Sequence, residues 1–175
     1  MKTSIETKRL LLRELLPSDD RGMFELDSNP EVHRFLGNKP VKNIEESRVY
    51  IENVRQQYLD NGIGRWAVIL KETNEFIGWS GLKLIKDSVN DHQNFHEIGY
   101  RFIQKHWGKG YATEAALAFI DYGFNDLKID VIYAYADKGH PGSRNVLEKL
   151  GMQYVNSFEY YGEEEVWYEL KNSNA

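Results

Sequence analysis

The segment Gln104–Glu114 carries the residue types and spacing that most clearly indicate chemistry. Gly108 and Gly110 flank Lys109, between a stretch that alternates like a strand and one with a helical pattern. Glycine has no Cβ and tolerates left-handed dihedral angles, so a ligand can approach its main chain closely. N–H groups that converge on a helix start, where the dipole adds about half a positive charge, favour a phosphate group. The segment therefore predicts a phosphate-binding turn, with Lys109 as a mobile positive charge.

Spacing excludes two common phosphate loops. A P-loop needs Ser or Thr directly after its lysine, whereas Gly110 and then Tyr111 follow Lys109. A dinucleotide-binding fingerprint needs a third glycine where Thr113 stands. On its own, a pair of glycines one residue apart fits a tight strand-to-helix turn without a ligand equally well.

Composition narrows the class of protein. The chain has 22 basic and 27 acidic residues, which gives a net charge of −5. A protein that neutralises nucleic-acid phosphates should be basic, so no nucleic-acid partner is expected. The absence of cysteine excludes disulfides, thiolate metal sites and a cysteine nucleophile. His92 and His96 have the spacing of a metal-binding pair on a helix, but they fall on a loop and a strand start, so no metal is expected.

The 175 residues are expected to form one cytoplasmic domain, residues 1–175. No linker rich in proline or serine divides the chain. No apolar run approaches the ~20 residues that a membrane span requires, so no membrane partner is expected. Residues 1–15 carry charges throughout, which is unlike a signal peptide.

Hydrophobic periodicity predicts the elements that must hold the turn. Alternation with a period of two predicts strands at 9–14, 66–70, 76–85, 96–103, 131–136, 152–161 and 165–170. Capping residues and helical spacing predict helices at 18–26, 30–37, 43–61, 113–125 and 141–150. Most strands are hairpin neighbours, so the expected class is α+β, with a mixed, largely antiparallel sheet and helices on both faces.

Longer stretches of the chain resemble a known family. Four stretches are similar to the GNAT acetyltransferases, and most to their ribosomal-protein N-terminal (RimJ/RimL-like) branch: IETKRLLLREL, WAVILKETNEFIGWSGL, EIGYRFIQKHWGKGYATEA and GSRNVLEKLGM. The likeness runs from about Ile5 to Leu170, in the family's order. It implies a GNAT-like sheet of six or seven strands with about four helices, which opens like a V between two central strands. It also implies acetyl-CoA as the acetyl donor.

The resemblance also implies which residues bind acetyl-CoA. The family's pantetheine arm runs along main-chain groups that correspond to Arg101, Phe102 and Ile103. Two positions depart from the family's pattern: Lys105 replaces a Gln or Arg and keeps a basic group, and His140 replaces an Asn that contacts CoA. The family's pyrophosphate loop falls on Trp107, Gly108, Lys109, Gly110, Tyr111 and Ala112.

Ser143 matches the family serine that lies beside the CoA sulfur at a helix start. The resemblance implies that its hydroxyl protonates the departing thiolate, directly or through a water molecule. Many GNAT enzymes use a tyrosine from the same helix instead, but Leu147 occupies that place. The alternative for Ser143 is a purely structural helix cap, a role that serines commonly fill.

Two glutamates are candidates for the base that deprotonates the amine. Glu97 shares a strand face with Gly99 and Arg101, and Glu159 resembles, with a small gap, a late-strand glutamate of the ribosomal-protein branch. The alternative for each is a solvated strand carboxylate or, for Glu97, an ion pair with Arg101. An α-amine has a pKa near 8 and a lysine near 10.4, so an N-terminal substrate makes the milder demand on a base. A main-chain N–H near Phe102 would polarise the thioester carbonyl.

The sequence thus predicts an acetyl-CoA-dependent N-acetyltransferase that acts on a primary amine, with a protein N-terminal α-amine as the leading acceptor. One alternative acceptor is a small amine, such as a polyamine, an amino sugar or an antibiotic. A different class is a non-catalytic acyl-CoA-binding module, which the departure at His140 keeps open. Homodimers are common in the resembling branch, so a homodimer is the oligomer that the resemblance implies.

Overall fold

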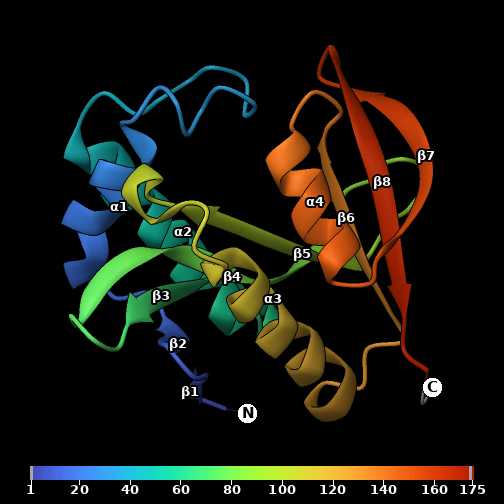
Figure 1. The fold of residues 1–175 in the computed structure, drawn as a ribbon, viewed down its shortest axis with the longest axis horizontal. Helices are drawn as coiled ribbons and strands as arrows, with labels where there is room; N and C mark the ends of the chain where they lie inside the picture. Colours follow the sequence, from blue (N-terminus) through green and yellow to red (C-terminus); the bar gives the residue numbers. More distant parts are fainter. Residues whose placement is uncertain (1, 174) are drawn as a thin grey trace.

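The computed structural model describes residues 2–173 and 175. Within them, eight strands form one sheet in the order β1-β2-β3-β4-β5-β6-β8-β7 (Figure 1). Neighbouring strands are antiparallel except β5 and β6, which are parallel. The strands are β1 (Ser4–Glu6), β2 (Leu10–Glu14), β3 (Trp66–Leu70), β4 (Glu75–Ile85), β5 (Phe95–Phe102), β6 (Val131–Asp137), β7 (Gln153–Tyr160) and β8 (Glu163–Lys171).

Helices cover both faces of the sheet, as predicted. In the described residues α1 (Asp20–Asp27) and α2 (Ile44–Asn61) pack on one face, and α3 (Tyr111–Asp121) and α4 (Pro141–Lys149) on the other. Short helical turns precede α1 (Pro17–Asp19) and α3 (Gln104–His106), and a π-helical turn (Tyr122–Asp126) follows α3. The predicted class is confirmed. The eighth strand is the three-residue β1, which is too short to produce an alternating pattern.

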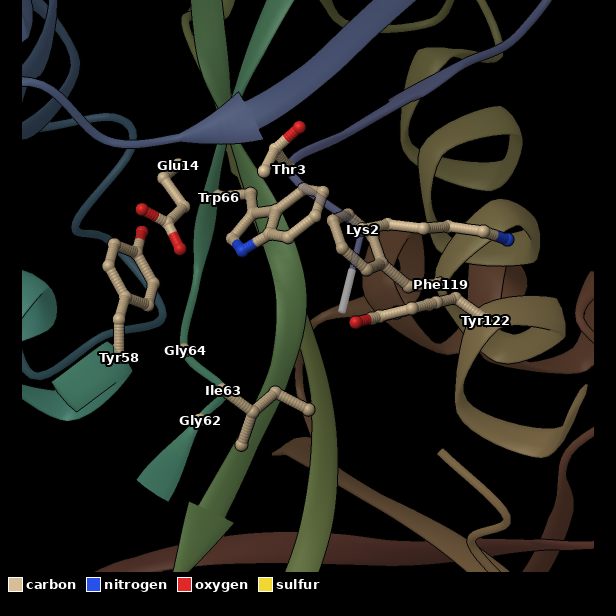
Figure 2. A pocket seen from close by; sticks show the side chains of 10 residues that line it. All are labelled: Lys2, Thr3, Glu14, Tyr58, Gly62, Ile63, Gly64, Trp66, Phe119 and Tyr122. Atoms are coloured by element: carbon tan, nitrogen blue, oxygen red, sulfur yellow. The ribbon is translucent and has the colours of Figure 1, made fainter. Parts of the chain in front are cut away.

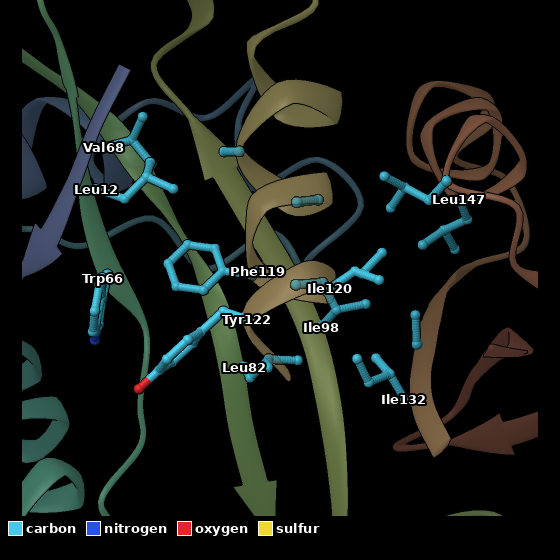
Figure 3. Packing of buried hydrophobic residues seen from close by; sticks show 14 of the residues in the cluster. Leu12, Trp66, Val68, Leu82, Ile98, Phe119, Ile120, Tyr122, Ile132 and Leu147 are labelled. Atoms are coloured by element: carbon cyan, nitrogen blue, oxygen red, sulfur yellow. The ribbon is translucent and has the colours of Figure 1, made fainter. Parts of the chain in front are cut away.

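The core beneath α3 fixes this helix against the sheet. Figure 3 shows Phe119 of α3 on the side of Val68 and Trp66 of β3, and Ile120 beside Ile98 of β5. Phe119 also meets the ring of Trp66 edge to face, with centroids 5.4 Å apart. Burial of each such side chain contributes about 1.5–3 kcal/mol. Ala115 and Ala116, both fully buried in the same cluster, extend this packing toward the start of α3 and the turn before it.

The pairing of the two central strands ends early. β5 and β6 are in register only at His96 with Ile132 and at Glu97 with Tyr133. Beyond these pairs the strands diverge, as Figure 1 shows. We call residues 98–102 of β5 and 134–137 of β6 the β5–β6 fork. The break leaves main-chain groups of β5 without a strand partner.

The segment between α1 and α2 differs from the prediction. Residues 30–37 were expected to be helical, but they form successive turns, with bonds such as Val32 N–H to the Asn29 carbonyl at 3.2 Å. The Asn29 side chain caps the N–H of Glu31, so a helix-start signal is present, but no full helical ladder follows. The next helix agrees with the prediction, since the Asn43 side chain accepts a bond from Glu46 N–H at the start of α2.

Candidate functional site

Residues 107–112, here called the phosphate loop, have the conformation that the sequence predicted. Gly108 and Gly110 have φ values of +71° and +81°, in the left-handed region that favours glycine. Gly110 is the N-cap of α3, whose hydrogen-bond ladder begins with Glu114 N–H to the Gly110 carbonyl at 3.0 Å. The earlier N–H groups of α3 thus lack intrahelical partners. A Cβ at Gly108 would meet no atom within 4 Å, so the loop is open there and fits a diphosphate group.

The lysines around the phosphate loop have different surroundings. Lys105 Nζ lies 2.6 Å from Glu75, and this hydrogen bond raises the pKa of Lys105 and lowers the pKa of Glu75. The ammonium group of Lys105 is therefore already paired with the carboxylate of Glu75. Lys109 is exposed and has no ion pair among the described residues. Lys109, rather than Lys105, is available to a phosphate.

Main-chain groups at the end of β5 alternate in direction. Ile103 N–H donates to the Ile77 carbonyl of β4 at 2.9 Å, so Ile103 and Arg101 direct their main chain toward β4. Phe102, between them, faces the fork. Its carbonyl accepts a bond from Trp107 Nε1 at 2.7 Å, and its N–H has no hydrogen-bond partner among the described residues. The predicted ligand contacts of Arg101 and Ile103 remain predictions.

Ser143 lies at the start of α4, against the β5 side of the fork. The N-cap of α4 is His140, whose Nδ1 accepts a bond from Ser143 N–H at 3.4 Å. The capping role is therefore filled by His140, and the Ser143 hydroxyl is left for another partner. That partner is Tyr100 of β5, whose hydroxyl lies 3.2 Å from Ser143 Oγ.

Tyr100 brings a second hydroxyl to Ser143 from the strand β5. Its hydroxyl donates to the Ser143 carbonyl at 3.0 Å, and burial raises the pKa of Tyr100 to about 12. The phenol is thus protonated at neutral pH. Because it has one proton and gives it to the carbonyl, Ser143 Oγ donates to the phenol oxygen in this arrangement. Sequence reasoning missed Tyr100, since it lies 43 positions from Ser143.

Residues 28–43, here called the strap, extend toward α4 (Figure 1). Phe35 stacks on the His140 ring with centroids 4.5 Å apart and planes 19° apart. The other end of the strap is held by Asp27, whose Oδ1 accepts from Arg101 Nη1 at 2.7 Å and lies 3.1 Å from His33 Nε2. His140 stands where the family has an Asn. It caps α4 through its ring nitrogen and contacts the strap through its stack on Phe35.

Glu97 is held in an ion pair, though not with the predicted partner. Its Oε2 lies 2.7 Å from Arg65 Nη2, and the side chains of Glu97 and Arg65 are only 12% and 7% exposed. Arg101 pairs with Asp27 instead. The close approach needs Gly99, because a Cβ there would lie 2.6 Å from Arg65 Nη2. Glu97 therefore has a structural role in addition to its place beside the fork.

Glu165 is the last of three consecutive glutamates and the only one of the three that is not exposed. It lies half-buried on β8, directly opposite Asp137 of β6. Burial, together with the nearby charges of Asp137, Glu163 and Glu97, raises the pKa of Glu165 to about 7. Glu97, Asp137 and Glu165 are here called the carboxylate cluster. The available signal was the alternation of β8, which places Glu165 on the same face as buried Trp167.

Glu159 lies away from this cluster. It is exposed on the edge strand β7, opposite Glu164, and therefore on the other face of the sheet from Glu165. Within the described residues its carboxylate has no ion-pair partner. Its predicted role as a base stays a prediction, and the structure does not bring it to Glu97.

A small cavity of about 110 Å³ lies far along α3 from the phosphate loop. Figure 2 shows Glu14 and Tyr58 on one side and Trp66 and Tyr122 on the other, with the side chain of Lys2 extended away. Phe119 and Tyr122, at the C-terminal end of α3, contribute to its wall, whereas the loop precedes the first turn. The cavity is therefore separate from the fork.

Comparison with known proteins identifies the fold. A family profile described as an acetyltransferase (GNAT) domain matches residues 9–153. The chain belongs to the GNAT acetyltransferase family. It is 33% identical to YkkB of Bacillus subtilis over 99% of this chain and 98% of that protein. It is also 33% identical to the N-acetyltransferase p20 of Bacillus licheniformis, over 86% of this chain and 82% of that protein. A GNAT acetyltransferase structure from Bacillus anthracis superposes with a TM-score of 0.80 at 27% identity, covering 97% of this chain and 98% of that one.

Family membership makes this protein an N-acetyltransferase with acetyl-CoA as co-substrate. The alternative of a non-catalytic module loses support because the acetyltransferase domain and the N-acetyltransferase relatives match this chain. Whether His140 contacts CoA in place of the family's Asn stays a prediction. The open phosphate loop, Lys109 and the free N–H of Phe102 fit the diphosphate and the thioester arm of this donor. Within the described residues, no helix is long and apolar enough to cross a membrane.

Proposed function

We propose that this GNAT enzyme acetylates the α-amine of a protein N-terminus, as the RimJ/RimL-like branch does. One arrangement carries the catalytic part of the proposal: the phosphate loop, the unpaired end of β5 and the Ser143 hydroxyl surround the same fork. A donor bound along β5 with its diphosphate at α3 would carry its thioester past Phe102 toward Ser143. A homodimer and a cytoplasmic location remain predictions.

The residues around the fork match the steps of direct transfer. Acetyl-CoA supplies an acetyl thioester, and an amine held beside it can attack without an acyl-enzyme. The Phe102 N–H donates a hydrogen bond to the thioester carbonyl oxygen. As the C–N bond forms and the C–S bond breaks, the attacking nitrogen loses its extra proton to water and the Ser143 hydroxyl gives its proton to the sulfur. Tyr100 O–H, which bonds the Ser143 carbonyl beforehand, turns to the serine oxygen 3.2 Å away, and water returns a proton to Ser143 once the thiol has left.

Glu165 is the base that we favour, and its pKa bears on the acceptor. Proton transfer from an α-amine of pKa about 8 to a carboxylate of pKa about 7 is uphill by only about 1.4 kcal/mol. Transfer from a lysine of pKa about 10.4 is uphill by roughly 4.6 kcal/mol. The milder step supports an N-terminal substrate. Glu97 and Glu159 remain the alternatives that the sequence proposed.

A small polyamine is the second candidate acceptor. The spermidine N(1)-acetyltransferase of Escherichia coli is 27% identical over 80% of this chain and 70% of that protein. The carboxylate cluster would attract a cationic amine of either kind. The two acceptors differ in pKa and in length, so a direct comparison separates them.

The test is an acceptor screen with acetyl-CoA, read out as release of free thiol. One arm uses peptides with a free α-amine and acetylated lysines, a second uses N-acetylated peptides with free lysines, and a third uses spermidine. We expect the first arm to give the highest kcat/KM at pH 7.5, by at least tenfold. Faster turnover of spermidine would replace the α-amine by a polyamine, and thiol release from none of the three would overturn both acceptors.

A further inference from the structure

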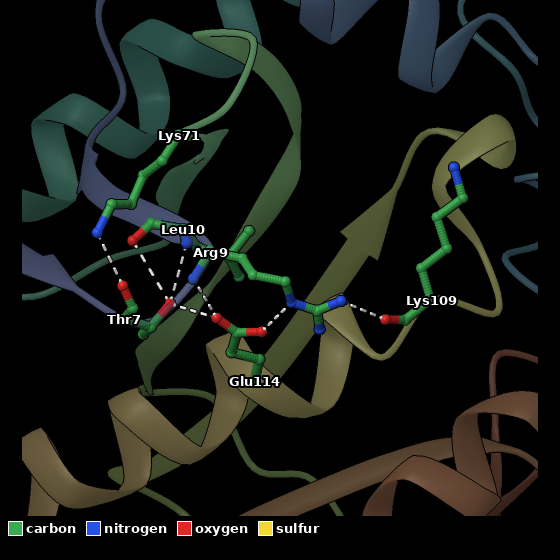
Figure 4. A network of polar contacts seen from close by, with 6 residues as sticks. All are labelled: Thr7, Arg9, Leu10, Lys71, Lys109 and Glu114. Carbon is green, nitrogen blue, oxygen red and sulfur yellow. Dashed lines mark hydrogen bonds and ion pairs between the residues drawn. The ribbon is translucent and has the colours of Figure 1, made fainter.

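Arg9, in the connection between β1 and β2, contacts both the phosphate loop and α3 (Figure 4). Its Nη1 donates to the Lys109 carbonyl at 2.8 Å, and its Nε lies 2.6 Å from Glu114 Oε2. Arg9 N–H and Thr7 Oγ1 both donate to Glu114 Oε1, at 2.8 and 2.7 Å. Arg9 therefore links the connection between β1 and β2 to the phosphate loop, although Arg9 and Lys109 are 100 positions apart in the sequence.

The bond to Lys109 sets the direction of a peptide unit in the loop. In a planar trans peptide the C=O of Lys109 and the N–H of Gly110 point in opposite directions. Because Arg9 holds the carbonyl on its own side, the Gly110 N–H is turned to the opposite side of the loop. A carbonyl directed at a bound diphosphate would repel it, whereas an N–H attracts it.

The hydrogen bonds to Glu114 offset the negative charge that this residue places at the start of α3. A carboxylate in this first turn would repel an incoming diphosphate. Burial disfavours the charge of Glu114, but hydrogen bonds from Thr7 and Arg9 outweigh it and lower the pKa of Glu114, so its charge is paired. The Arg9 guanidinium also lies over the Tyr111 ring, 4.4 Å from its centroid. Its Nη2 lies 3.4 Å from the place of a Cβ at Gly110 and has no hydrogen bond to the described residues.

We propose that Arg9 is a positioning residue for the diphosphate of acetyl-CoA: it turns the Gly110 N–H outward and cancels the charge of Glu114. This rests on the proposed binding of acetyl-CoA at the phosphate loop. The effect of Arg9 is confined to donors that carry a diphosphate. A residue needed only for folding would affect every donor alike.

The test compares two acetyl donors in Arg9→Gln and in the native protein. Acetyl-CoA carries the diphosphate, and S-acetylpantetheine has the same thioester arm without it. We expect KM for acetyl-CoA to rise about tenfold with kcat changed less than twofold, and kcat/KM for S-acetylpantetheine to stay within twofold. Arg9→Lys keeps the positive charge but loses the planar set of N–H donors of the guanidinium. Its affinity for acetyl-CoA should therefore lie between those of Arg9→Gln and the native protein.

Arg48→Gln is the matched control. Arg48 also pairs with two carboxylates, those of Asp20 and Glu45, but it lies on α2 and not beside the phosphate loop. It should leave both donors unaffected. Calorimetry with CoA and with pantetheine gives the same comparison without any acceptor, so a wrong acceptor would not obscure the result. Equal losses for both donors in folded Arg9→Gln and Arg9→Lys would show a role in folding alone and overturn the proposal. If CoA does not bind the native protein, the proposed donor site fails instead.

Discussion

The phosphate loop and the carboxylate cluster, which lie on different sides of the fork, present different chemical groups. The phosphate loop is six consecutive residues that act through main-chain N–H groups at a helix start. The carboxylate cluster consists of three side chains from β5, β6 and β8, brought together by strand register. The loop tolerates changes of side chain provided its glycines keep their dihedral angles. The cluster depends on the charge and burial of each carboxylate, so single substitutions should change its chemistry without unfolding it.

The largest expected effect is on the proton donor between the two sides. Ser143→Ala should lower kcat by roughly ten- to a thousandfold with little change in acetyl-CoA affinity, because the hydroxyl acts mainly in the transition state. Steady-state kinetics and calorimetry measure the two quantities. Since His140 supplies the cap, the melting temperature should hold; intact turnover with a lower melting temperature would return Ser143 to a structural role.

The next effect tests the dependence of the loop on its dihedral angles. Gly110→Val should weaken acetyl-CoA binding at least tenfold, about 1.4 kcal/mol, because a β-branched residue resists φ near +81°. Gly162→Val is the matched control, with φ of +82° at a hairpin tip and open space around its Cβ. Calorimetry should find normal affinity in the control. Unchanged affinity in folded Gly110→Val would remove the loop from the donor site.

A smaller, pH-dependent effect tests the carboxylate cluster. Glu165→Gln should lower the rate about tenfold between pH 7, where Glu165 ionises, and the pKa of the amine, and less at higher pH, where the amine arrives deprotonated. The recovery should centre near pH 8 for an α-amine and continue toward pH 10 for a lysine or polyamine.

Parallel variants decide which carboxylate acts. Glu97→Gln breaks a buried ion pair with Arg65 and should lower the melting temperature as well as the rate. Glu159→Gln changes an exposed edge-strand residue and should leave both unchanged. A pH-dependent defect in Glu159→Gln alone would restore the base that the sequence proposed.

The same residue predicts how stability depends on pH. The pKa of Glu165 is raised from 4.5 to about 7 on folding, so the folded state binds this proton more tightly than the unfolded state. Its contribution to stability is present below pH 4.5 and is lost as pH rises through 7. In thermal melts, the melting temperature of Glu165→Gln should rise relative to that of the native protein between pH 4.5 and 7. Above pH 7 the difference between the two melting temperatures should stay constant. A constant difference across the whole range would mean that Glu165 is not buried as described.

The smallest effect is expected at the strap. His140→Asn keeps a good N-cap residue but loses the stack on Phe35, worth about 0.5–1.5 kcal/mol. Acetyl-CoA affinity should change less than threefold, and Phe35→Ala should give the same fall in melting temperature. A tenfold loss of affinity in His140→Asn alone would mean that His140 contacts the donor.

The sequence by itself determined the features that depend on local patterns. The glycine spacing of the phosphate loop, the Asn43 cap of α2 and most strand positions follow from dihedral preferences and periodicity within a few residues. Family likeness then supplied the roles of the loop and of Ser143. The helix expected at residues 30–37 shows the limit of such signals, since a start without a sustained ladder yields only turns.

Only the tertiary structure decided which distant groups meet. Tyr100 reaches Ser143, Arg9 reaches Lys109, and Glu165 faces Asp137 because strand register and helix packing place them there. No local pattern encodes such distances. The raised pKa of Glu165 has the same origin, because desolvation and neighbouring charges exist only after the strands have paired. A run of three glutamates is uniform in sequence, and the fold gives one of them a different chemistry.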